Sequence, residues 1–518
     1  MSKQQGAAGS TWAVGHKSIH MIASLASGAF VGKVLGFVRE ILMARVFGAS
    51  LITDSFRSSS TAVAMPLIPM QNEGVPAVII PMHLSWQKDG TAPRKLAALC
   101  AGLSMIALAI MLTLQISGSW GIRLLVGRME PEGQALTLQI FRVMAFWMPA
   151  SVLLNCLAAA EIATGRSRIA ALRPTILNLS VIAGIVLFGL TGHLYFLPLF
   201  FALSFNLLAA YGVWSLRADG SLDPSGLEIN LIVDVCKEFA RRLRPLLLQP
   251  LAEQGQVWLE RFIASGFVVG TLGSIDFART LTDSAVLLIG QPIGMAVLAS
   301  ASSKEARHSI TSIATPLMVI AIPGAIFLAV FAPDIVGLVF ARGAFDETAV
   351  RLTSGALRGI AMGIWAATLG SILMRFLNLA GRNREAALVL ASAFAGNAVV
   401  NIIAWKIVGS SGDGSYLIGL GEAMRGLILL AGTAVLLEVH WPLLRLGRQL
   451  LPAAATALIL CLSVQVGCKG TWPHLTFGTI ACMASIVVAA RHAMPEQLNL
   501  TVAHLVARAK SFRLRFHS

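Results

Sequence analysis

The chain is organised as long apolar runs separated by short polar connections. Most runs hold roughly twenty or more predominantly apolar residues, the length that an α-helix needs to cross the hydrocarbon core of a bilayer. The pattern predicts an all-α polytopic membrane protein with about fourteen transmembrane helices. The runs lie at residues 20–47, 57–83, 96–117, 137–163, 170–190, 193–216, 245–266, 273–300, 309–331, 349–379, 385–408, 415–437, 449–467 and 472–490.

The composition agrees with a membrane protein. Of the 518 residues, 56% are hydrophobic and 13% are charged, and the mean hydropathy of +0.76 exceeds that of soluble globular proteins. The six cysteines form no CxxC pair, so we interpret them as small core or lipid-facing residues. The first twenty residues lack the order of a signal peptide, so we expect the first helix to be retained.

The basic residues of the connecting segments indicate the orientation. With both termini placed in the cytoplasm, twenty-four of the forty lysines and arginines lie in inside segments and four lie in outside segments. Cytoplasmic loops of membrane proteins carry such an excess. The net charge of +15 is thereby explained without a nucleic-acid partner. The basic tail is expected either to lie on the inner leaflet as an amphipathic helix or to be frayed.

An internal repeat relates the first six predicted helices to the next six. At an offset of 222, four residues have identical counterparts: Arg39 and Arg261, Gly48 and Gly270, Asp54 and Asp276, and Arg57 and Arg279. At an offset of 216, GRSRIAAL (165–172) matches GRNREAAL (381–388). An even number of helices per repeat gives both halves the same orientation, which is the plan of parallel-repeat transporters with a central site between lobes.

The repeat divides the predicted chain into six parts. These are a cytoplasmic N-terminal segment (1–19), an N-lobe (20–216), a cytoplasmic basic linker (217–244), a C-lobe (245–437), helices 13 and 14 (438–490) and a basic cytoplasmic tail (491–518).

Charged residues inside the apolar runs carry the functional signal. The chain has no GxxxxGK[ST], HExxH or GxSxG motif, and its predicted outside loops are short, so a transporter is favoured over an enzyme. Ionisable groups within a membrane span face a protein interior or a watery cavity. Lys33 and Arg39 lie six residues apart on the first helix and predict a cationic cavity. Such a cavity favours an anionic substrate, because guanidinium groups bind phosphate oxygens in pairs.

Several motifs along the chain have a recognisable pattern. The first helix reads VLGFVREILMARVFGASLITDSF (34–56), and NEGVPAVIIP (72–81) and RPTILN (173–178) follow. Further on lie ASG (264–266) and FARGAFDETAVRLTSGALRG (340–359). Together these motifs resemble the MurJ/MviN family. Members of this family are flippases of lipid II, the lipid-linked peptidoglycan precursor, within the multidrug/oligosaccharidyl-lipid/polysaccharide exporter superfamily. The resemblance implies two six-helix lobes and a terminal helix pair that helps to form a groove for the polyprenyl tail.

The resemblance assigns roles residue by residue. The two arginines of the family's first helix fall on Lys33 and Arg39, and the aspartate after that helix falls on Asp54. The segment MPLIPMQNEG (65–74) has no arginine where the family usually carries two. FART places Arg279 one position earlier than the family pattern.

The predicted site has three parts. Lys33, Arg39 and Arg279 are the candidates for binding the diphosphate. A cation site is a further candidate, and its residues are Glu253, Asn397 and Asn401. The asparagine pair is explained better by helix packing than by cation binding. The gating and cavity residues are Asp54, Arg57, Glu73, Arg261 and Asp276.

The predicted function is transfer of an undecaprenyl-diphosphate-linked glycan, lipid II first, from the inner to the outer leaflet of the bacterial inner membrane. A lipid-linked repeat unit of an exopolysaccharide or other surface polysaccharide is the alternative cargo, and a cation-coupled multidrug exporter is a second alternative. No cofactor or metal is expected, and Na⁺, H⁺ or the membrane potential are the candidates for coupling. The expected partners are the glycan lipid, membrane lipids, and cell-wall or polysaccharide assembly proteins.

Overall fold

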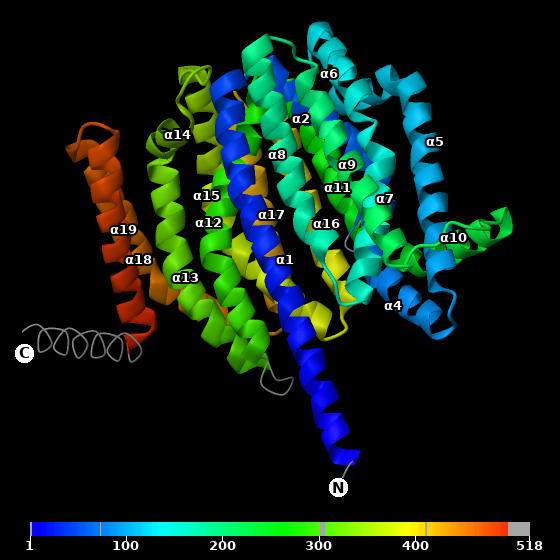
Figure 1. The fold of residues 1–518 in the computed structure, drawn as a ribbon. Coiled ribbons are helices and arrows are strands. Elements are labelled where there is room, and N and C mark those ends of the chain that lie inside the picture. The colour runs from blue at the N-terminus through cyan, green and yellow to red at the C-terminus, as the bar shows by residue number, and fades with distance from the viewer. Residues whose placement is uncertain (1–2, 73, 301–305, 410–411, 496–518) are drawn as a thin grey trace, which may run out of the picture. The chain divides into compact units, whose positions relative to one another are not determined.

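The computed structural model describes residues 3–72, 74–300, 306–409 and 412–495, and within these ranges it holds helices and no strand (Figure 1). The chain forms two compact units. The first comprises Met1–Gly273 and Arg342–Phe345, and the second comprises Ser274–Ala341 and Asp346–Ser518. The lobe boundaries that the repeat indicates stay predictions.

The first unit holds the helices that end before residue 265. They are α1 (Lys3–Phe47), α2 (Leu51–Ala64), α3 (Ile68–Gln71), α4 (Gly74–Lys88), α5 (Ala92–Val126), α6 (Pro131–Met144), α7 (Trp147–Ala163), α8 (Arg168–Thr191), α9 (Phe196–Ala218), α10 (Ile229–Leu243) and α11 (Leu248–Ala264), with 3₁₀ turns at Met65–Leu67 and Arg244–Leu246.

The second unit holds the remaining helices. They are α12 (Thr271–Ser300), whose first turn belongs to the first unit, α13 (Ala306–Val330), α14 (Ala332–Phe340), α15 (Glu347–Leu379), α16 (Asn383–Val408), α17 (Ser415–Leu436), α18 (His440–Gly467) and α19 (Thr471–Ala493).

The helices agree with the predicted class of fold. Within the described residues, ten helices are long and apolar enough to cross a membrane, or up to eleven if α6 and α7, which meet at 47°, form one span. Helices α1, α11 and α12 lie where the first, seventh and eighth spans are predicted, and the total of about fourteen spans stays a prediction. The predicted all-α polytopic membrane fold is confirmed.

The second span is broken. Helix α2 ends at Ala64 and α4 begins at Gly74, with Pro66 and Pro69 opening the two short turns between them. Proline removes a backbone donor and clashes with the preceding turn, so a continuous helix cannot form here. The Asn72 side chain donates to the carbonyl of Ile68 at 2.8 Å and accepts from the N–H of Gly74 at 2.7 Å. These bonds satisfy backbone groups that lipid cannot satisfy.

The FARGAFD motif forms a turn against the end of α1. The N–H of Ala344 donates to the carbonyl of Arg45 at 2.9 Å. Gly48 and Gly343 both have positive φ, at 63° and 65°. A Cβ added to Gly48 would lie 2.3 Å from the carbonyl oxygen of Ala344, so the close approach of the two segments requires glycine there.

The predicted linker is itself helical. Helix α10 buries Val235, Phe239 and Leu243, which are spaced four residues apart, and leaves its charged residues outside. It packs against α4 and α5 and lies crosswise to them in Figure 1. An amphipathic helix of this kind suits the membrane–water interface.

Helix α17 is fixed by close packing against α15. A Cβ added to Gly359 would lie 2.4 Å from the carbonyl oxygen of Tyr416, and one added to Gly363 would lie 2.2 Å from Cα of Ala423. Small residues spaced four apart let membrane helices approach closely enough for dispersion contacts. This packing positions the charged residues of α17.

Candidate functional site

The first charged cluster, which we call the α1 cluster, consists of Arg39 and Glu40 of α1 and Arg57 of α2. Nε of Arg39 donates to Oε1 of Glu40 at 3.1 Å, and Nη2 of Arg39 also contacts that oxygen. Nη2 of Arg57 donates to Oε2 of the same carboxylate. Glu40 is 2% exposed. One buried carboxylate therefore lies between two guanidinium groups.

The orientation of Arg39 is set by a third helix. Its Nη1 donates to Oδ1 of Asn178 on α8 at 2.9 Å, and Nδ2 of Asn178 donates to the carbonyl of Gly32 at 2.8 Å. The Arg39 side chain remains 23% exposed. Lys33, the other predicted cation of this helix, is exposed. On α1, Arg39 is therefore held by a hydrogen bond to Asn178, whereas Lys33 is exposed.

The second charged cluster, the α17 cluster, has the same arrangement in the second unit. Nη2 of Arg279 on α12 donates to Oε1 of Glu422 on α17 at 2.6 Å. Nε and Nη2 of Arg425 lie 2.8 and 2.6 Å from Oε2 of Glu422. Nη1 of Arg279 lies 3.6 Å from Oδ1 of Asp276. Glu422 is 9% exposed, and the Arg279 side chain is 26% exposed.

Each cluster contains one arginine of a pair that the repeat relates. Arg57 and Arg279 are counterparts at the offset of 222, and each is paired with a buried glutamate from another helix of its own unit. The two glutamates are not counterparts. Sequence reasoning did not place Glu40, Glu422 or Asn178 in the site. The available signal was a carboxylate within an apolar run, next to Arg39 or three residues before Arg425.

Asp54, a residue of α2, contacts the start of α12. Its Oδ2 and Oδ1 accept the backbone N–H groups of Gly270 and Gly273, each at 2.7 Å, within the first unit. The residue is 3% exposed. A carboxylate that receives the first N–H groups of a helix caps it and complements its dipole. The structure thus gives this predicted gating residue a capping contact.

The remaining predicted residues are dispersed. Arg261 is buried on α11, and Glu253 is exposed on the same helix. Glu73 lies outside the described residues.

The two asparagines of the predicted cation site lie together on α16. Nδ2 of Asn401 donates to Oδ1 of Asn397 at 2.6 Å, and both side chains are buried. Within the described part of the chain, Nδ2 of Asn397 and Oδ1 of Asn401 have no hydrogen-bond partner. A Cβ added to Gly421 would lie 2.6 Å from Oδ1 of Asn401, so this oxygen borders α17 beside Glu422.

An apolar groove of about 930 Å³ lies within the second unit. Helices α13, α15, α17 and α18 line it. Among the lining residues, one from each helix in that order, are Ile322, Trp365, Leu430 and Leu451. Two polar residues, His440 and Arg448, stand among its lining on α18. The rest of its lining is apolar.

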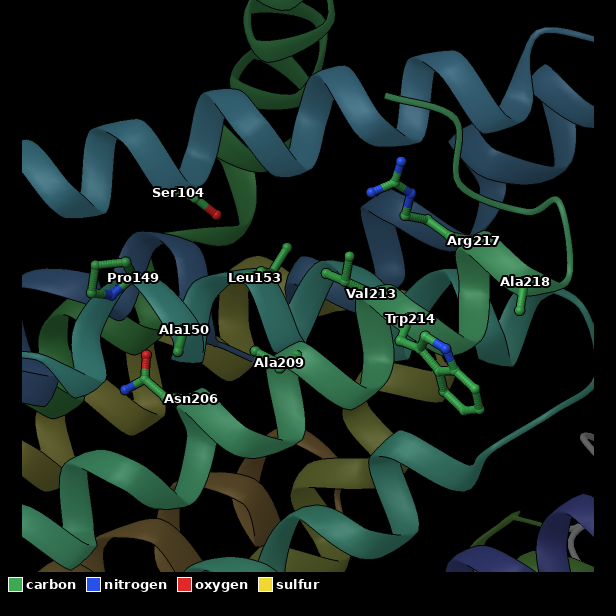
Figure 2. A pocket seen from close by; sticks show the side chains of 11 residues that line it. Ser104, Pro149, Ala150, Leu153, Asn206, Ala209, Val213, Trp214, Arg217 and Ala218 are labelled. Atoms are coloured by element: carbon green, nitrogen blue, oxygen red, sulfur yellow. The ribbon is translucent and has the colours of Figure 1, made fainter. Parts of the chain in front are cut away.

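A second pocket, of about 850 Å³, lies in the first unit between α5, α7 and α9 (Figure 2). Ser104 extends from α5 and Arg217 and Trp214 from α9, while the wall between them is mostly small apolar residues. None of the predicted site residues lines this pocket, so it is separate from the α1 cluster.

Apolar spans, buried charge clusters and an apolar groove together define a multi-pass helical membrane protein. A family model described as lipid II flippase MurJ matches residues 43–469. The chain therefore belongs to the MurJ family of lipid II flippases. The predicted family and the assignment to a transporter rather than an enzyme are confirmed.

Two relatives show the extent of the similarity. The probable lipid II flippase MurJ of Buchnera aphidicola subsp. Acyrthosiphon pisum is 21% identical over 369 residues, which are 66% of this chain and 70% of that protein. The lipid II flippase MurJ of Burkholderia cenocepacia is 26% identical over 380 residues, which are 67% and 70% of the two chains.

Solved structures share the fold. A lipid II flippase MurJ in an inward closed conformation superposes with a TM-score of 0.77 at 14% identity, covering 90% of this chain and 98% of the other. An inward-facing multidrug resistance MATE family transporter of the MOP superfamily gives 0.62 at 13% identity, covering 82% and 98%. At these identities the likeness concerns the fold alone.

Proposed function

We propose that this protein is a flippase that carries lipid II from the inner to the outer leaflet of the bacterial inner membrane. The observation that carries the proposal is the family match over residues 43–469, which spans both copies of the internal repeat. Alternating access of the two lobes around a central site is the mechanism that the parallel-repeat plan favours. Both termini lie in the cytoplasm in this proposal, as the excess of basic residues in inside segments favours.

The diphosphate of the substrate is bound by Lys33, Arg39 and Arg279 in this proposal. Guanidinium groups bind phosphate oxygens in bidentate fashion, whereas an ammonium group acts as a point charge. The partial exposure of the Arg39 and Arg279 side chains, at 23% and 26%, supports access of an anion to both.

The polyprenyl tail is proposed to lie in the apolar groove of the second unit. Support comes from the lining, in which Trp365, Leu430 and Leu451 stand among mostly apolar neighbours, and from the participation of α18, the first helix of the terminal pair. Burial of apolar side chains against a hydrocarbon chain in this groove would hold the tail by dispersion contacts rather than by hydrogen bonds.

Coupling to a cation is proposed at Asn397 and Asn401, with Glu253 as the candidate third ligand. The unpartnered Oδ1 of Asn401 supports an oxygen ligand for Na⁺. The membrane potential alone would supply about 2.3 kcal/mol per charge per 100 mV. Transport by Asn401→Leu that keeps the full Na⁺ dependence of the wild type would refute this part of the proposal, whereas loss of that dependence with retained membrane insertion supports it.

A lipid-linked unit of a surface polysaccharide is the second candidate cargo. The favouring observation is the segment 65–74, in which the chain has two prolines and no arginine. Such cargo would share the diphosphate and the polyprenyl chain and differ in its sugar contacts. Cell-wall or polysaccharide assembly proteins are the corresponding proposed partners.

Complementation separates the two cargoes. The gene is expressed in a bacterium depleted of its own lipid II flippase, and membrane insertion is verified. Growth with restored outward transfer of lipid II supports the first cargo. Lysis despite normal membrane levels rejects it and leaves the surface polysaccharide. The Arg39→Ala variant serves as the matched negative control, since it removes a cation proposed to bind the shared diphosphate.

A further inference from the structure

Both charged clusters place a glutamate where an anionic substrate would bind. In the α1 cluster, Nε and Nη2 of Arg39 both contact Oε1 of Glu40. These two nitrogens form one edge of the guanidinium fork that matches a phosphate or carboxylate. Nη1 of Arg39 is engaged with Asn178. A phosphate that approaches this edge must therefore compete with Glu40.

In the α17 cluster the Nε–Nη2 edge that meets the carboxylate belongs to Arg425, and Arg279 contributes Nη2. Oε1 of Glu422 accepts from Nη2 of Arg279 at 2.6 Å, and Oε2 accepts from Arg425. Glu422 thus connects the arginine proposed to bind diphosphate with a second arginine on its own helix. In the α1 cluster Glu40 faces two guanidinium groups, whereas in the α17 cluster Asp276 is a second carboxylate, with its Oδ1 3.6 Å from Nη1 of Arg279.

Burial explains why these carboxylates stay paired in the absence of substrate. A charged group removed from water is strongly destabilised unless an opposite charge and hydrogen bonds compensate. Glu40 and Glu422 are 2% and 9% exposed, while the arginines that hold them retain partial exposure. The buried partner is therefore the internal anion, while the Arg39 and Arg279 side chains are 23% and 26% exposed.

We propose that Glu40 and Glu422 are internal counter-anions that hold guanidinium nitrogens of Arg39 and Arg279 when no substrate is bound and compete with the diphosphate for these nitrogens. The inference rests on the proposed function, because it concerns the same arginines. Competition lowers the affinity for the diphosphate and speeds its release, which a transporter needs in order to turn over. The glutamates are positioning residues that determine how tightly the arginines hold an anion.

The test removes each negative charge while keeping the shape of the side chain. Glu40→Gln and Glu422→Gln are purified in lipid nanodiscs, and binding of undecaprenyl diphosphate and undecaprenyl monophosphate is measured. We expect the diphosphate to bind about tenfold more tightly or better to each variant, because the competing charge is gone. The gain should be smaller for the monophosphate, which has fewer oxygens to engage the fork.

Glu161→Gln is the matched control. Glu161 is a buried glutamate of α7 that accepts the N–H of Ile169 at 2.8 Å, apart from both arginine clusters. Its substitution should leave diphosphate affinity unchanged. A transport assay on the two cluster variants should show a lower KM together with a lower kcat, because release becomes slower.

The outcomes distinguish this inference from the proposed function. If the wild type binds no undecaprenyl diphosphate, the proposed function fails. If the wild type binds and both cluster variants bind equally or more weakly, the glutamates serve only as structural ties and the inference is wrong. A thermal unfolding measurement on each variant shows whether a weakened binder is still folded, and tightening in either folded variant supports the competition.

Discussion

Substitution of Asp54 by asparagine tests the capping contact at the start of α12. The carboxylate accepts two backbone N–H groups at 2.7 Å, from Gly270 and Gly273, in a buried setting. Asparagine keeps one acceptor oxygen and replaces the other with a donor that opposes an N–H group. Loss of one charge-assisted hydrogen bond costs about 1.5–3 kcal/mol. Loss of the charge at the helix N-terminus adds about 0.3–1 kcal/mol.

The expected destabilisation of Asp54→Asn is therefore about 2–4 kcal/mol. In domains of 150–250 residues, each kcal/mol lowers Tm by about 2–4 °C. We expect the Tm of the purified variant to fall by roughly 4–16 °C, measured by tryptophan fluorescence during heating in one fixed detergent.

Asp234→Asn is the control for that measurement, because Asp234 is an exposed residue of α10. It should leave Tm within about 1 °C of the wild type, as surface substitutions do. Equal melting of the two variants would refute the capping argument. Loss of transport by Asp54→Asn without a loss of stability would then favour the gating role that the sequence predicted.

Two further substitutions test the packing of the helices. Gly363→Ala should lower Tm, because the added methyl would lie 2.2 Å from Cα of Ala423 and overpacking costs about 1–3 kcal/mol. Gly337→Ala is the control, because a Cβ at Gly337 would meet no atom within 4 Å. Equal Tm values for the two variants would contradict the close contact between α15 and α17. Asn72→Ala should destabilise the broken second span by about 1–3 kcal/mol, because the N–H of Gly74 loses its acceptor. Asn72→Asp retains the oxygen and should melt above Asn72→Ala in the same heating assay; the reverse order would contradict this role of Asn72.

The sequence determined the class of fold because the bilayer leaves few choices. A run of about twenty apolar residues in lipid must satisfy its backbone hydrogen bonds internally, so it becomes a helix wherever it stands in the chain. That rule placed the spans from hydropathy alone, and the motifs of the first helix and of FARGAFD indicated the family. These signals are local, since each depends on neighbours within one helix or one turn.

Only the tertiary structure decided how the charged residues are paired. Glu40 and Arg57 are 17 residues apart, Arg279 and Glu422 are 143 apart, and Asp54 and Gly270 are 216 apart. The sequence identified most of these charges but assigned the arginines to substrate without their buried glutamates. A buried carboxylate takes whichever cations the folded helices bring within reach, because leaving it unpaired in a low-dielectric interior is too unfavourable. Helix packing determines which cations these are, and the periodicity of the sequence does not predict the pairing.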